Sequence, residues 1–321
     1  PEYGHAEPAD TPRKLLPETF DWSNVEGVSY LVPNWNQHIP TYCGSCYAHG
    51  TLMALNDRIK VAKRGKAPDV MLSRQSFLNC GPAHGFGSGC GGGEPKDIYS
   101  FMYEVGLPDE TCNNYVAAVD GQCDAAAMCR NCMAIEQENG ELTHECWPVQ
   151  NYTSYHVSAF GRVSGEDGIM AEIFARGPVT CGFISDEDFD FGYEGGIWQK
   201  AVPAQNASEV NHDVEVTGWG VTTEGVPFWQ CRNSWGSYWG EKGFFKILRG
   251  SNLNEIESEC WFAVPDASEE ELIEGGILVG SMHGLRRKTA AAAREDADFV
   301  RALYSTDWSR TALPPALAVA E

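Results

Sequence analysis

The chain has 321 residues, of which 43% are apolar and 11% aromatic, and this is enough to bury a core and to exclude a wholly disordered protein. Its 45 acidic and 23 basic residues give a net charge of -22, which argues against nucleic acid or an anionic membrane surface as a partner. There is no run of about 18 apolar residues, so we expect no transmembrane segment. The acidity suits an acidic compartment and a solvated acidic surface equally well.

The first half of the chain is expected to be mainly helical. Residues 1–15 are polar and contain prolines, which predicts a flexible leader. Ser45 is a candidate N-cap for a first helix, a second is expected near 73–78, and a third ends at Gly106. The apolar positions at helical spacing are Ala48, Leu52, Leu55 and Ile59 in the first helix, and Ile98, Phe101, Met102 and Val105 in the third.

Twelve cysteines are present, and seven of them lie between Cys80 and Cys146. This density predicts a disulfide framework and an oxidising compartment. The segment 107–150 has little periodicity and is expected to form loops held by disulfides. The alternative is a zinc site made by Cys123, Cys129, Cys132, His144 and Cys146. Glycosylation sequons begin at Asn151 and Asn206.

The second half changes from helical to strand-like patterns. A helix over 168–176 precedes strand-like runs separated by glycines, at 179–184, 212–217, 228–232 and 244–248. A helical half and a strand-rich half predict an α+β fold of two subdomains, with the site in the cleft between them. Beyond Pro265 the sequence becomes acidic and then rich in alanine and proline, with helical character over 285–304. This tail is interpreted as an appendage, an address, or an inhibitor that presents Glu321.

A short run, Cys43-Gly44-Ser45-Cys46-Tyr47, carries the first sign of chemistry. Cys46 would begin a helix, where free N–H groups and the helix dipole favour a thiolate. Its backbone N–H and the amide of Gln37 would then donate hydrogen bonds to an oxyanion. Two alternatives stay open at this point: ordinary disulfide partners, or a thiol–disulfide oxidoreductase in which Cys43 pairs with Cys46.

Two later blocks follow in a fixed order: Asn211-His212-Asp213, and then Asn233-Ser234-Trp235-Gly236. Together with the cysteine run they resemble the papain-like cysteine peptidases. The resemblance implies that His212 acts as general base and then general acid for Cys46, and that Asn233 orients its imidazole. It also implies that Trp235 shields the Asn–His hydrogen bond from water.

Within that family the chain is most similar to the cathepsin X (cathepsin Z) group. The similarity lies in residues 36–46, 108–115 and 151–153. Gln37 is nine positions before Cys46, further than is usual in the family, which implies an inserted loop that narrows one side of the cleft. In the group a histidine of this loop recognises the carboxylate at the end of the substrate, and the match assigns that role to His38.

The resemblance also implies a substrate-binding wall and a disulfide pattern. Gly92 and Gly93, which follow Cys90, would let an extended peptide pair with the backbone of the enzyme. Cys46 would stay free as the nucleophile and Cys231 would be a small buried apolar residue. The implied pairs are Cys43–Cys90, Cys80–Cys123, Cys112–Cys129, Cys132–Cys146 and Cys181–Cys260.

We therefore expect a papain-like two-subdomain α+β fold, with a helical left subdomain, a β-barrel-like right subdomain and the active-site cleft between them. The expected units are a leader or propeptide remnant over 1–15, a peptidase domain over 16–265 and a C-terminal extension over 266–321. The peptidase domain would divide into a mainly helical part, about 26–150, and a mainly β part, about 151–265.

The expected function is a cysteine-type carboxypeptidase that removes single residues from the C-termini of peptides or proteins. It would need no cofactor and no metal, bind no nucleic acid, work as a monomer, and reside in the lysosome or vacuole or be secreted. Two alternatives are an endopeptidase of the same fold and a catalytically weak binding protein. The second is suggested by Asp213 and Glu215, carboxylates that could either stabilise or disturb the Cys46–His212 pair.

Overall fold

A computed structural model describes residues 4–119, 122–137, 139–202 and 210–266. Six α-helices are present in these residues: α1 (Cys46–Ala62), α2 (Arg74–Cys80), α3 (Pro95–Glu104), α4 (Ala125–Met128), α5 (Glu166–Arg176) and α6 (Glu187–Gly192). Short 3-10 helices lie at Arg13–Leu15, Pro82–His84 and Leu253–Glu255. No helix in the described part of the chain is both long and apolar enough to cross a membrane.

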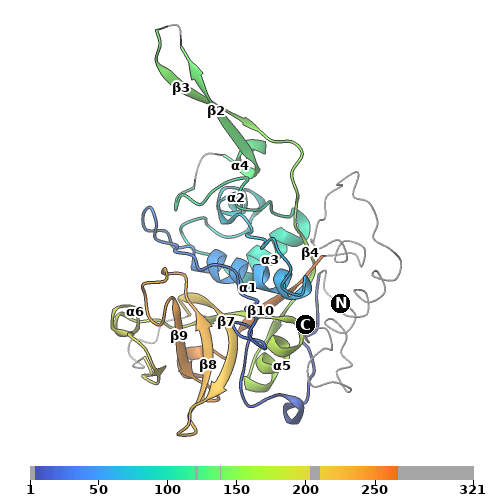
Figure 1. Cartoon of the computed structure of the whole chain (residues 1–321), viewed down its shortest axis with the longest axis vertical. Helices are drawn as coiled ribbons and strands as arrows, with labels where there is room; N and C mark the ends of the chain where they lie inside the picture. Colours follow the sequence, from blue (N-terminus) through green and yellow to red (C-terminus); the bar gives the residue numbers. More distant parts are fainter. Residues whose placement is uncertain (1–3, 120–121, 138, 203–209, 267–321) are drawn as a thin grey trace, which may run out of the picture.

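The four predicted helices are confirmed as α1, α2, α3 and α5, of which α1 and α3 had been predicted from apolar periodicity. Helix α1 is buried along nearly its whole length, because it lies between α2 and α3 on one side and the large sheet on the other (Figure 1). Ser45 holds the N-cap position of α1, but its hydroxyl does not cap the helix as we expected. The hydroxyl instead bonds Tyr115 and His49, which lie behind the site.

The second half supplies seven strands of one eight-stranded sheet, in the order β4-β10-β5-β7-β8-β9-β6, and β1 from the first half pairs with β7. All neighbours are antiparallel except β6 and β9. The strands are β1 (Phe20–Asp21), β4 (Val157–Val163), β5 (Val179–Phe183), β6 (Ile197–Trp198), β7 (His212–Val221), β8 (Pro227–Arg232), β9 (Phe244–Leu248) and β10 (Cys260–Pro265). The predicted strands are β5, β7, β8 and β9. A helical part beside one large sheet confirms the predicted α+β class.

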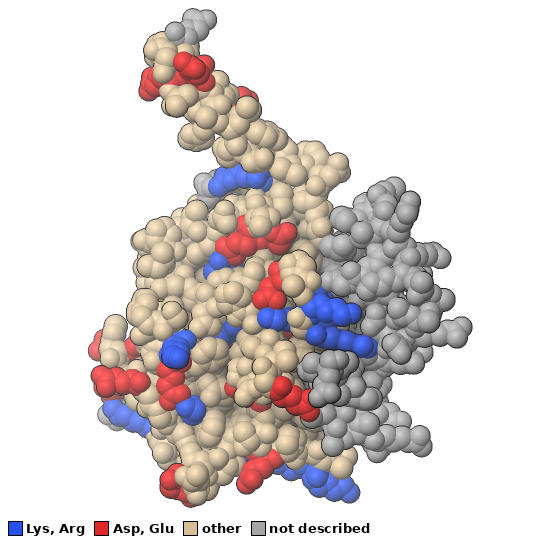
Figure 2. Space-filling model, in the orientation of Figure 1, with Lys and Arg blue, Asp and Glu red and all other residues tan. Residues whose placement is uncertain are grey.

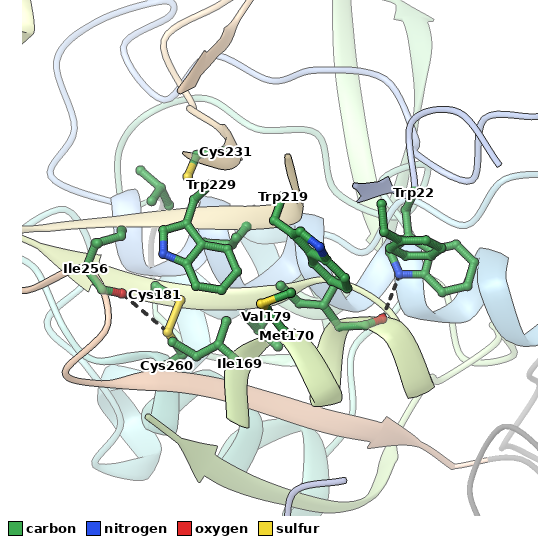
Figure 3. Close-up of a cluster of buried hydrophobic side chains, with 14 of the residues drawn as sticks. Trp22, Ile169, Met170, Val179, Cys181, Trp219, Trp229, Cys231, Ile256 and Cys260 are labelled. Carbon is green, nitrogen blue, oxygen red and sulfur yellow. Dashed lines mark hydrogen bonds between the residues drawn. A yellow bond between two sulfur atoms is a disulfide. The ribbon is translucent and has the colours of Figure 1, made fainter. Parts of the chain in front are cut away.

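The sheet packs on α5 through a core rich in tryptophan (Figure 3). Trp219 and Trp229 are fully buried and face Ile169 and Met170 of α5. Trp22 lies at one end of this core and donates from its indole to the carbonyl of Ile173, at 2.8 Å. Cys231 is buried in the same cluster, as a small apolar residue would be.

The segment 107–150 is not made only of loops, contrary to our expectation. Strands β2 (Arg130–Glu136) and β3 (Leu142–Pro148) form an antiparallel hairpin that projects from one end of the molecule (Figure 1). The residues of β3 are all exposed, so no face of the hairpin is apolar enough to give a strand period. Acidic side chains gather near its free end (Figure 2), where the sequence contributes Glu136, Glu141 and Glu145.

All five disulfides implied by the resemblance are present: Cys43–Cys90, Cys80–Cys123, Cys112–Cys129, Cys132–Cys146 and Cys181–Cys260. All four cysteines of the alternative zinc site are in disulfides. No thiolate is therefore left among them to bind zinc, and the structure contradicts that alternative. The pairing also joins Cys43 to Cys90 rather than to Cys46. The structure therefore contradicts the thiol–disulfide oxidoreductase alternative.

The described part of the leader lies against the body, unlike the flexible segment that we expected. The amide of Ala6 donates to the carbonyl of Phe160, and the amide of Ala9 donates to the carboxylate of Glu172. Ala9 and Thr11 are buried as a result. The expected helix over 285–304, the sequon at Asn206 and the extension from 267 onward lie outside the described residues.

Candidate active site

A cleft of about 450 Å³ brings together residues that lie far apart in the sequence. Its lining includes seven of the eight candidate site residues: Gln37, His38, Cys46, Gly92, Gly93, His212 and Trp235. The eighth, Asn233, is buried directly behind His212. The cleft contains side chains from α1, β7 and the loops that follow β8 and precede α3, so it depends on the docking of the helical part on the sheet.

Cys46 is the first residue of α1, so its thiol lies at the N-terminus of the helix, beside backbone N–H groups that have no partner within the helix. Two glycines allow this end of the helix to approach its neighbours closely. A Cβ on Gly44 would lie 2.7 Å from the carbonyl oxygen of Cys90, and one on Gly50 would lie 3.1 Å from that of Asp213. Because neither glycine has a side chain, Cys46 can lie beside the Gly92–Gly93 wall on one side and beside β7 on the other.

His212 and Asn233 meet because β7 and β8 are antiparallel, with Glu215 paired to Arg232. The start of β7 therefore lies next to the end of β8. The Nε2 of His212 is 2.9 Å from the Oδ1 of Asn233, which fixes that nitrogen as the N–H donor and leaves Nδ1 to accept a proton. The ring of Trp235 stacks on the imidazole at 4.7 Å and 24°, and so covers this hydrogen bond.

Gln37 is held with its amide nitrogen on the Cys46 side. Its Oε1 accepts from the hydroxyl of Ser234 at 2.6 Å, and its Nε2 donates to the carbonyl of Cys43 at 3.1 Å. An amide nitrogen has two hydrogens, so one remains for an oxyanion in the cleft. The hydroxyl of Tyr115 donates to the backbone carbonyl of Gln37 at 2.6 Å and lies 2.9 Å from the Ser45 hydroxyl.

Burial acts on both members of the catalytic pair. It raises the pKa of the Cys46 thiol to about 12, with a further contribution from the negative charge of Asp213. It lowers the pKa of His212 to about 4, against the raising effect of the Asn233 hydrogen bond. Each ion alone is therefore unfavourable here, whereas transfer of the proton from Cys46 to His212 forms both ions together, in mutual contact.

His38 lies at the other side of the cleft in the loop before Cys43. Its ring stacks on that of Tyr42 at 4.9 Å and 8°, and its backbone N–H donates to the side chain of Asn36. The Nδ1 of His38 is buried and has no hydrogen-bond partner in the described part of the chain. Burial lowers the pKa of this imidazole. The ring is thus held in place with hydrogen-bonding capacity unused.

The two carboxylates that we singled out, Asp213 and Glu215, occupy different environments. Glu215 is fully buried and bonds the guanidinium of Arg232, which also bonds Asp57 of α1. It lies outside the cleft lining and is part of an ion cluster that joins α1 to the sheet. Asp213 lines the cleft, and its charge raises the pKa of Cys46.

Sequence reasoning missed the residues that support the site. Tyr42 holds His38, Ser234 holds Gln37, and Tyr115 joins Gln37 to the start of α1. Tyr115 and Tyr42 fell within the segments that carried the resemblance, but no spacing rule shows which backbone group a tyrosine hydroxyl will reach. Such contacts depend on the tertiary structure.

Comparison with known proteins gives one consistent result. A family model described as "Papain family cysteine protease" matches residues 16–264. A protein named Cathepsin Z from Onchocerca volvulus is 39% identical over 260 residues, which cover 78% of this chain and 79% of that protein. The Cathepsin B-like cysteine proteinase 6 of Caenorhabditis elegans is 30% identical over 270 residues, covering 78% of this chain and 67% of that one.

A solved structure, that of digestive procathepsin L 3 from Tenebrio molitor larval midgut, supports the fold. Its TM-score is 0.62 with 23% identity, and the match covers 81% of this chain and 74% of that one. At this identity the similarity concerns the fold alone.

Proposed function

Because the chain belongs to the papain family of cysteine proteases, we propose that it is a cysteine carboxypeptidase that removes one residue at a time from the C-termini of peptides. The observation that carries the proposal is the position of His38. It lines the same cleft as Cys46 and His212, and its ring stacks on that of Tyr42. A 39% identical protein named Cathepsin Z supports the same assignment.

The first chemical step uses Cys46, His212 and the oxyanion donors. The Cys46 proton passes to the free Nδ1 of His212, and the thiolate attacks the last peptide carbonyl of the substrate. The Gln37 amide and the Cys46 backbone N–H stabilise the negative charge on the carbonyl oxygen. The imidazolium then gives its proton to the leaving nitrogen, and the C-terminal amino acid departs with an acyl-enzyme left behind.

The second step returns the enzyme to its starting state. His212 removes a proton from water, which attacks the thioester, and the proton then returns to the Cys46 sulfur as the shortened peptide leaves. Asn233 keeps the Nε2 of His212 occupied through both steps, so Nδ1 remains the group that exchanges protons. Trp235 limits the access of water to that hydrogen bond.

His38 gives the reaction its direction along the substrate. A terminal carboxylate that accepts a charge-assisted hydrogen bond from His38 has its last peptide bond near Cys46. Burial lowers the pKa of the His38 imidazole in the free protein. A bound carboxylate would raise this pKa again, so acidic pH favours the pair of charged imidazolium and carboxylate. We therefore assign Gly92 and Gly93 to the acyl part of the substrate and His38 to its free end.

The experiment compares a peptide bearing a free C-terminal carboxylate with its C-terminal amide twin. Each is incubated with reduced protein at mildly acidic pH, and the products are followed by mass spectrometry. Stepwise loss of single residues, from the free acid only, is the expected result. In the His38→Ala variant the preference for the acid over the amide should shrink, while Cys46→Ala should show no cleavage.

Two other outcomes would overturn parts of the proposal. Internal cleavage of both peptides would retain the role of Cys46 and refute that of His38, in favour of an endopeptidase. A folded, reduced protein could also cleave neither peptide. If an epoxide-type cysteine-protease inhibitor fails to label it as well, the result would favour a binding protein. The disulfides support folding in the secretory pathway, and the lysosome, vacuole or cell exterior remains the proposed location.

A further inference from the structure

Asp213 is a buried carboxylate that the reaction above does not use. It follows His212 on β7, lines the cleft and is only 8% exposed. No hydrogen bond or ion pair reaches its side chain from the residues that the structure describes, and the neighbouring charges that act on it, those of Glu94 and Glu259, are negative. Burial and these charges raise the pKa of Asp213 to about 8, so without a cation the carboxyl is protonated at mildly acidic pH, whereas a cation beside it would favour the ionised form.

The carboxylate lies in the cleft beside a glycine and an apolar side chain. Asp213 pairs across the strands with Gly182 of β5, where a Cβ would lie 3.4 Å from the Oδ1 of Asp213 and 2.6 Å from the Cγ1 of Val210. Gly182 contributes no side chain, and Val210 packs against it. Val210 also lines this part of the cleft and offers an apolar surface for a methylene stem.

The charges of the cleft favour a cation. Glu94 and Asp190 line it together with Asp213, and no lysine or arginine is found among its described lining residues. Glu94 adjoins the Gly92–Gly93 wall, which we assigned to the acyl part of the substrate. His38, which we assigned to the free C-terminus, comes from a different loop.

We propose that Asp213 binds the side chain of an arginine or lysine in the acyl part of the substrate, upstream of the bond that is cleaved. This inference rests on the proposed function and adds a substrate class to it: peptides with a basic residue near the C-terminus. A guanidinium bonds a carboxylate through two parallel N–H groups, so arginine is the better guest. A cation bound there also offsets the repulsion that Asp213 exerts on the Cys46 thiolate.

The test uses peptides that differ only by arginine or citrulline, its uncharged counterpart, placed second, third or fourth from the C-terminus. At fixed pH and ionic strength, kcat/KM for arginine should exceed that for citrulline by about ten- to a hundredfold at one of these positions. In Asp213→Asn the ratio should fall to about one, and in the control Glu224→Gln, an exposed carboxylate outside the cleft lining, it should change by no more than about twofold.

Equal rates for arginine and citrulline at every position would overturn the proposal, as would a ratio that survives Asp213→Asn. The ratio cancels any general effect of the substitution on His212, since both peptides use the same catalytic pair. The comparison with wild-type protein alone decides the question if the variant does not fold. If cleavage proves to be internal, the carboxypeptidase proposal fails, and the ratio at the internal site still tests Asp213.

Discussion

Replacing Arg232 with methionine would leave two carboxylates buried without their counterion. The guanidinium donates to Glu215, to Asp57 and to the carbonyl of Val32, each at 2.6 Å, and the three charged side chains have no exposed surface. Methionine fills similar space without a charge. Removal of one partner from a buried ion cluster lowers the free energy of unfolding by about 3–5 kcal/mol.

The loss should depend on pH in a defined direction. Burial already raises the pKa of Asp57 and Glu215, and Arg232 opposes that rise, so their folded-state pKa values climb further in the variant. A carboxyl whose folded-state pKa is raised destabilises the fold as pH rises above its unfolded value. The deficit relative to wild type should therefore be smaller near pH 4 and should grow toward pH 7.

Urea unfolding followed by tryptophan fluorescence measures both effects, with disulfides intact and Cys46 alkylated to prevent self-digestion. The matched control is Glu215→Gln, which leaves Asp57 and Arg232 as a balanced pair and should remain within about 1 kcal/mol of wild type. A loss below about 1 kcal/mol in Arg232→Met, or a deficit that does not change with pH, would show that the cluster does not join α1 to the sheet as described.

Three further predictions concern the site. In His212→Ala, the Cys46 thiol, with its pKa raised to about 12, has no base, so the rate of iodoacetamide labelling at pH 6 should fall by at least about a hundredfold; an unchanged rate would contradict proton transfer to the imidazole. In Trp235→Ala, water reaches the 2.9 Å hydrogen bond of His212, and kcat should fall about two- to tenfold with KM little changed; an unaltered kcat would refute the shielding role. In Tyr115→Phe, the loss of the hydrogen bond to Gln37 should lower kcat/KM about two- to tenfold, and no loss in a stably folded variant would show that Tyr115 does not position the oxyanion donor.

The sequence was informative where a pattern repeats along one element. The apolar spacing of α1 predicted the helix, and the order of the cysteine, histidine and asparagine blocks predicted residues that line or back a single cleft. The β2–β3 hairpin was not predicted because neither of its faces is buried, so its sequence lacks the alternation of apolar and polar residues that indicates a strand. Ser45 was misjudged because Tyr115, which is distant in the sequence, supplies its hydroxyl with a better partner than the helix end.

Asp213 was noticed in the sequence, but its environment could not be predicted from it. The sequence marked both Asp213 and Glu215 as unusual and, because they are two positions apart on one strand, treated them alike. The fold gives Glu215 the counterion Arg232 and leaves Asp213 facing the cleft. Which of two carboxylates finds a cation is decided by an arginine on the neighbouring strand, and no local pattern specifies that pairing.

The dependence of the site on the contact between α1 and β7 has a consequence for how activity is lost. The thiol belongs to one element and the imidazole to the other, and the Gly50–Asp213 approach keeps the two together. Any loosening of that contact separates nucleophile from base before either half has unfolded. A copy in which this contact loosens therefore loses its nucleophile–base pair while most of its structure is intact.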